Sequence, residues 1–120
     1  MPTVTVATNA EVPDGEGLIQ EMTDALHKYV DCPREFVHIH LLQSQTGSWG
    51  GDTKQPWCHV RMVLGEGQVA ADRRKGLAEA AIGPIQAHTK AGGRVQVLFE
   101  EAPLDCLYIA SVGNLLSASN

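Results

Sequence analysis

The chain has 120 residues, 43% of them hydrophobic, which suits one domain with a packed core. Its formal net charge of −5 at pH 7 argues against a nucleic-acid partner, which requires a basic surface. No apolar run approaches the length of a membrane span and the N-terminus lacks a signal-peptide pattern, so we expect a cytoplasmic protein with no membrane partner and three reduced cysteines.

The first predicted element is a β-strand directly behind a proline. The segment "TVTVATN" alternates apolar and polar residues, a pattern typical of a strand. Methionine is usually removed when a small residue follows it, and Pro2 would then have a free secondary amine. An α-amino pKa is ordinarily near 8 and burial lowers it, so the neutral amine could remove a proton beside a carbonyl group. The alternative is that Pro2 stands there by chance and only leads into the strand.

A helix and a second strand complete the first half of the chain. Apolar residues at helical spacing predict a helix from Gly17 to Val30, and the following "DCP" ends it because proline disfavours helical backbone before it. The segment "FVHIHLLQ" alternates again and predicts a strand in which His38 and His40 share one side. Together these elements predict a β-α-β unit.

The second half repeats this order of elements after a glycine-rich loop, "SQTGSWGGDTKQP". "WCHVRMVLGEG" predicts a strand, residues 68–93 have a helical pattern with a kink or break expected at Gly83–Pro84, and "RVQVLFEE" predicts the last strand. We therefore divide a single domain over residues 1–120 into pseudo-repeats at about 2–45 and 57–102 and a C-terminal tail at 103–120.

Two tandem β-α-β units predict an α/β fold, an α+β two-layer sandwich with a four-stranded sheet and both helices on one face. The other face of such a sheet is left uncovered, so it must meet another subunit or carry polar groups. The tail is too apolar to remain unpaired, and we expect it to add a short edge strand to a neighbouring subunit.

Several features together resemble the tautomerase superfamily. They are the Met-Pro start before a strand, the two tandem β-α-β units, the chain length and several short sequence motifs. "VPDG" and the "GG" before "P-x-C" are similar to the macrophage migration inhibitory factor family, while "GGDT" and "EG" followed by "AD" and "KG-L" are similar to the cis-3-chloroacrylic acid dehalogenases. The resemblance implies a homotrimer in which Pro2 lies in a pocket at a subunit boundary and acts as a general base or acid on enols and α-keto acids.

The other catalytic positions of the family are not retained. Cys32 stands where the inhibitory factors have a lysine, Gly65 and Gln68 where the dehalogenases have two arginines, and Ile109 near their water-activating glutamate. Hydrolytic dehalogenation is therefore disfavoured. The resemblance further places Gln96 and Leu98 at positions of an aromatic and an amide pocket residue, Leu26 at a histidine position, and His38 at a substrate arginine of the smaller 4-oxalocrotonate tautomerases.

The candidate substrate-binding residues follow from these matches and from nearby side chains. Leu64 matches a residue whose backbone amide lines the pocket, His38 and Gln96 occupy matching positions, Arg61 is a nearby cation, and Trp49 offers an apolar wall. The alternative is that Trp49 packs and that the charged side chains are only solvated. His38, His40 and His59 are also candidate ligands of a metal ion. We expect instead that they face a subunit interface, with no metal and no cofactor.

The sequence thus predicts a proline-based tautomerase that catalyses a 1,3-proton shift on small enols or α-keto acids of the phenylpyruvate type. The alternative is a trimeric binding or structural protein of the same fold with weak or no activity. The missing lysine, arginines and aromatic residues favour the alternative. Pro2 favours the enzyme, because a scaffold has no need of a free proline amine.

Overall fold

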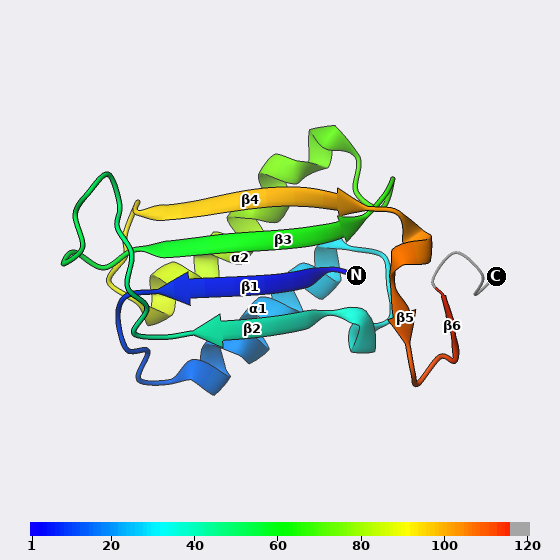
Figure 1. The fold of residues 1–120 in the computed structure, drawn as a ribbon, viewed down its shortest axis with the longest axis horizontal. Helices are drawn as coiled ribbons and strands as arrows, with labels where there is room; N and C mark the ends of the chain where they lie inside the picture. The colour runs from blue at the N-terminus through cyan, green and yellow to red at the C-terminus, as the bar shows by residue number, and fades with distance from the viewer. Residues whose placement is uncertain (116–120) are drawn as a thin grey trace.

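The computed structural model describes residues 1–115, which form a mixed four-stranded sheet with two helices (Figure 1). The strand order is β2-β1-β3-β4, with bounds Thr3–Thr8 for β1, His38–Leu42 for β2, Cys58–Gly65 for β3 and Val95–Ala102 for β4. β1 pairs with β2 and β3 with β4 in parallel, while β1 and β3 are antiparallel at the centre. The predicted fold class is therefore confirmed.

Both helices, α1 (Gly15–Tyr29) and α2 (Arg74–His88), lie on the same face of the sheet (Figure 1). α1 begins after Asp14, whose carboxylate accepts a hydrogen bond from the Gly17 N–H at 2.9 Å, as an N-cap residue does. Leu18, Met22 and Leu26 follow at intervals of four and are fully buried against the sheet. α1 thus begins two residues before the predicted Gly17 and ends one residue before the predicted Val30.

α2 continues through Pro84, so the alternative of a break at Gly83–Pro84 was wrong. Proline removes one backbone donor and normally disrupts a helix interior. Here Leu77, Ala81 and Ile85 are all fully buried on one face of α2, on both sides of the proline. Their burial stabilises the helix beyond what one lost hydrogen bond destabilises.

The hydrophobic core lies between the sheet and the helices, and alternate residues of the strands face it. On the two central strands these are Val4, Val6, Val60, Met62 and Leu64, each 1% exposed or less. The opposite face of the sheet carries the intervening side chains, and no helix of residues 1–115 covers it (Figure 1). Leu98, on the edge strand β4, is 50% exposed on this face, so a large apolar side chain is left open to solvent there.

The glycine-rich loop folds back on one end of the open face. Asn9 holds the loop, because its side-chain amide donates to the carbonyls of Thr53 and Gln55 at 3.1 and 3.0 Å and its oxygen accepts from the Trp57 N–H at 3.1 Å. The Trp57 ring is buried beneath the loop and stacks on His59, with ring centres 4.3 Å apart. This end of the open face is therefore closed by the chain itself.

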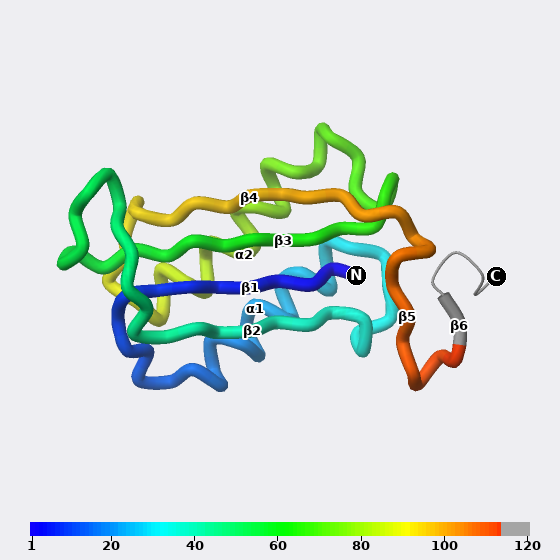
Figure 2. The backbone as a smooth tube through the Cα atoms, in the orientation of Figure 1, coloured from blue at the N-terminus to red at the C-terminus, as the bar shows by residue number. Residues whose placement is uncertain are grey.

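The tail forms a short hairpin beyond the other end of the sheet (Figure 2). The 3₁₀ turn η3 (Leu104–Cys106) leads into β5 (Tyr108–Ile109), which pairs antiparallel with β6 (Asn114–Leu115). The rest of the tail, residues 116–120, lies outside the described residues. Its pairing with a neighbouring subunit stays a prediction. Among residues 1–115, neither α1 nor α2 has the length and apolar character needed to cross a membrane.

Candidate active site

Pro2 lies buried at the start of the central strand β1. Its carbonyl accepts a hydrogen bond from the His38 N–H at 3.1 Å, which extends the β1–β2 pairing by one residue. Met1 precedes it and is only 4% exposed. With Met1 present the Pro2 nitrogen belongs to a peptide bond and has no basic lone pair. Removal of Met1 would create the secondary amine at this buried position.

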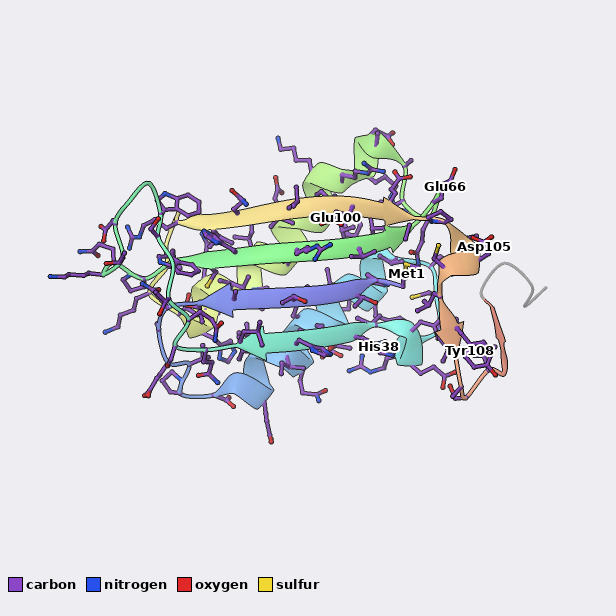
Figure 3. All side chains as sticks on the ribbon, in the orientation of Figure 1. Met1, His38, Glu66, Glu100, Asp105 and Tyr108 are labelled. Atoms are coloured by element: carbon purple, nitrogen blue, oxygen red, sulfur yellow. The ribbon has the colours of Figure 1, made fainter. Side chains whose placement is uncertain are left out.

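A cavity of about 340 Å³ lies beside Met1 at this end of the sheet. Three connections of the chain meet there, namely α1 to β2, β3 to α2, and β4 to the tail hairpin. The lining residues are Met1, Asp31, Cys32, Pro33, Phe36, Glu66, Gly67, Gln68 and Leu104. A second hollow adjoins it, shares Glu66, Gly67 and Leu104, and adds Pro103 and Asp105. Figure 3 shows Met1, Glu66 and Asp105 at this same end of the sheet.

Gln68 joins the N-terminus to the turn that follows β3. Its side-chain oxygen accepts from the Gly65 N–H at 2.8 Å, and its side-chain nitrogen donates to the Met1 carbonyl. Gly67 makes this turn possible because its φ of +74° lies in the left-handed region that favours glycine. If Met1 is removed, the Gln68 amide loses its acceptor and becomes a free donor beside the new amine.

Burial sets the electrostatics of this site. It lowers the pKa of the Met1 amino group, against a smaller opposite effect of Cys32. Burial likewise raises the pKa of the Cys32 thiol, while the positive amino group acts in the opposite direction. The two groups therefore lie close enough to sense each other's charge. Burial thus shifts the Met1 amine toward its neutral form, which is the form that accepts a proton.

Comparison with solved structures relates the whole chain to proteins of known fold. A macrophage migration inhibitory factor homologue from Prochlorococcus marinus matches with a TM-score of 0.83 and 21% identity, over 96% of this chain and 99% of that one. A fused 4-OT wild-type symmetric trimer matches at 0.82 and 18%, over 98% of each chain. The chain has the fold of the tautomerase superfamily. Pt0534, in a structure inactivated by 2-oxo-3-pentynoate, matches at 0.78 and 20%, over 96% of this chain and 95% of that one. The sequence matches no protein-family model and no curated protein.

Within this tautomerase fold, two of the predicted binding residues lie beside Pro2. The His38 backbone bonds to Pro2, and the His38 ring donates through Nε2 to the Glu35 carbonyl at 2.8 Å. The Leu64 side chain is fully buried in the core, so only its backbone is available to a ligand. The role of either residue in substrate binding stays a prediction.

The other three predicted binding residues lie farther from Pro2 in the same subunit. Arg61 pairs with Glu100 on the open face through two hydrogen bonds, one of them 2.8 Å long. Gln96 is in register with His59, which is itself in register with Ala7 near the far end of β1. The Trp49 ring also lies at that far end, 5.9 Å from the His59 ring. One subunit alone does not bring these three residues to its Pro2.

Sequence reasoning missed Gln68, Glu66, Phe36 and Leu104 as residues of the cavity. Gln68 was noted only as the replacement for an arginine. The signal for it was local, since the glycines of "GEGQ" mark a tight turn at the end of a central strand. Leu104 gave no such signal, because its place depends on how β4 and η3 approach the N-terminus.

Proposed function

We propose that the protein is a proline-based tautomerase acting on small enols or α-keto acids of the phenylpyruvate type. The observation that carries the proposal is the buried Pro2 at the start of the central strand, beside the 340 Å³ cavity, in a tautomerase fold. After Met1 is removed, the Pro2 amine takes a proton from the enol oxygen or from the carbon beside the carbonyl. It then returns the proton to the other end of the same O–C–C frame, so that one double bond moves and no atom is lost.

The local environment supports this role for the amine. Burial already lowers the pKa of the amino group at this end of the sheet, and a base works best when its pKa is near the pH of the solution. The proline ring also fixes the direction of the nitrogen lone pair. The cavity walls supply apolar contacts from Phe36, Pro33 and Leu104 for the rest of a small substrate.

We further propose that the protein is a homotrimer and that a neighbouring subunit completes each site. The open sheet face supports this, because the half-exposed Leu98 and the 42% exposed Leu42 stand on it. Arg61, Gln96 and Trp49 would then approach the Pro2 of a neighbour rather than that of their own subunit. Cys32, Cys58 and Cys106 are all free, which favours a cytoplasmic location.

A binding or structural trimer without activity is the second candidate. It is favoured by the lining of the cavity, which contains no lysine, arginine or histidine. Such a protein would keep the fold and lose the chemistry. The two candidates differ in whether a free Pro2 amine matters.

The test compares three purified forms whose N-termini are verified by intact mass. They are the Met1-free protein, a form with one residue added ahead of Pro2, and Pro2→Ala. We expect the added residue to lower the rate of enol-phenylpyruvate ketonisation by about two to four powers of ten, because it converts the amine to an amide. Pro2→Ala keeps a primary amine and should lose less. Equal activity in the Met1-free and extended forms, with matched circular dichroism, would favour the second candidate.

A covalent probe gives an independent readout of the same amine. The similar protein Pt0534 is inactivated by 2-oxo-3-pentynoate. We expect this compound to add once to the Met1-free protein, with the mass increase on the N-terminal peptide. The extended form should remain unmodified at that peptide.

A further inference from the structure

The cavity beside Pro2 is negatively charged and has no positive side chain in its lining. Asp31 and Glu66 contribute two carboxylates, and Asp105 adds a third in the adjoining hollow. In the described part of the chain, neither Asp31 nor Glu66 has a side-chain hydrogen bond or ion pair that would neutralise it. The remaining lining side chains are uncharged.

The arginines of the described residues are bound elsewhere. Arg34, Arg61 and Arg74 pair with Asp24, Glu100 and Glu101 respectively. Arg73 donates to the Tyr29 carbonyl at 3.0 Å and Arg94 to the Pro56 carbonyl at 2.7 Å. None of them lines the cavity of its own subunit, and Arg61, which a neighbour would contribute in the proposed trimer, is paired with Glu100.

The base itself adds no positive charge in its active form. A proline amine that accepts a proton must first be neutral, and burial favours that form at this end of the sheet. A substrate carboxylate in this cavity would therefore meet two carboxylates and no cation of the same subunit, while the Arg61 of a neighbour would bring its partner Glu100 with it. An anion that leaves water without a partner is destabilised, and like charges nearby add repulsion.

The cavity offers instead a neutral hydrogen-bond donor. The Gln68 side-chain nitrogen donates to the Met1 carbonyl, so it is free once Met1 is removed. Its oxygen is fixed by the Gly65 N–H at 2.8 Å, which holds the amide in place. An oriented amide N–H suits a carbonyl or enol oxygen, and it needs no charge on the ligand.

From these observations, and resting on the proposed function, we infer that the site selects uncharged carbonyl compounds and their enols over carboxylate substrates. The uncharged positions Gln96 and Leu98 on β4 agree with this inference, since a neighbouring subunit that presents them adds no cation. The protein would accordingly act on aldehydes, ketones, esters or amides with an acidic α-hydrogen. Within the proposed substrate class, uncharged enols would then be turned over faster than α-keto acid anions such as phenylpyruvate, which would remain slower substrates of the same site.

The test uses a matched pair that differs only in charge, enol-phenylpyruvate and the enol of its primary amide, with the Met1-free protein at pH 7. We expect kcat/KM for the amide to exceed that for the acid by about tenfold or more, from the Coulomb repulsion of two carboxylates. An acid turned over as fast as the amide, or faster, overturns the inference.

Charge-neutral variants identify the source of the selectivity. Glu66→Gln combined with Asp31→Asn should shift the amide-to-acid ratio toward the acid by about five- to tenfold. Glu16→Gln removes one carboxylate from the exposed first turn of α1, at the other end of that helix, and should leave the ratio as it is. An unchanged ratio in the double variant would count against the inference.

A binding measurement separates this inference from the proposed function. Phenylacetamide and phenylacetate undergo no observable turnover, and their affinities can be compared by NMR titration of the Met1-free protein. Tighter binding of the amide supports the charge selectivity even if neither enol is turned over, in which case only the tautomerase proposal fails. Tighter binding of phenylacetate overturns the charge selectivity whatever the activity.

Discussion

At the scale of single residues, Gln68 connects the fold to the site. Its side chain accepts a hydrogen bond from the Gly65 N–H and donates one to the Met1 carbonyl, so it ties the turn after β3 to the start of the chain. Gln68→Leu leaves that N–H without its acceptor, and we expect a loss of about 1–3 kcal/mol in the free energy of unfolding. Gln68→Glu keeps an acceptor for Gly65 and should be more stable than Gln68→Leu. Urea unfolding monitored by circular dichroism checks this order, and equal stabilities would contradict it.

The pH dependence of activity tests the Pro2 amine. The proposed base is the neutral amine, so kcat/KM should rise with pH through the amine pKa and then level off. Burial lowers the pKa of the Met1 amino group, and the same burial acting on the Pro2 amine would place the midpoint below the ordinary value near 8. The measurement is a pH profile on the Met1-free protein with an uncharged enol. A midpoint above 8, or no acidic limb, would contradict the assignment.

At the scale of elements, the end of β3 packs against the turn η3, so substitutions in the two elements should have non-additive effects on stability. A Cβ added at Gly65 would lie 2.6 Å from Leu104 Cδ2, so the end of the half-buried Leu104 side chain would have to move away. We expect Gly65→Ala to be mildly destabilising and to turn the Leu104 side chain away from its place in the cavity lining. In the double variant with Leu104→Ala the clash is removed, so the destabilisation should be smaller than the sum of the single effects. Additive effects in urea unfolding would show that the two elements are not coupled.

The elements themselves were largely predictable, and the site was only partly so. Period-two alternation located the strands, and the spacing of Leu18, Met22 and Leu26 located α1, because these patterns report burial on one side. The continuity of α2 through Pro84 was not predictable, since it depends on packing against the sheet. Pro2 was predicted from its position, and its catalytic role stays a prediction. Gln68 and Leu104 were not, because the fold brings them to Met1 from far along the chain.

At the scale of the whole molecule, the two ends of the sheet differ. One end has the N-terminus, the cavity and the tail hairpin, while the other is closed by the glycine-rich loop over Trp57 (Figure 1). Between them the open face presents the Arg61–Glu100 pair and the exposed Leu98. In the proposed trimer, a neighbouring subunit on this face would bring its own residues toward the cavity. A substitution that prevents trimer assembly is therefore expected to lower catalytic activity as well.

The last prediction uses Leu98 to separate assembly from folding. Leu98 is half exposed in the subunit, so Leu98→Asp should change the stability of an isolated subunit little. In a trimer the same substitution would bury an unpaired carboxylate at the interface, which is strongly unfavourable. We expect the variant to sediment as a folded monomer at micromolar concentration with little activity. Ala71→Asp, which adds the same charge at an exposed position of the turn before α2, should remain trimeric and active. A trimeric Leu98→Asp would mean that Leu98 lies outside the interface, and a monomeric wild type would mean that the open face has no partner of its own kind.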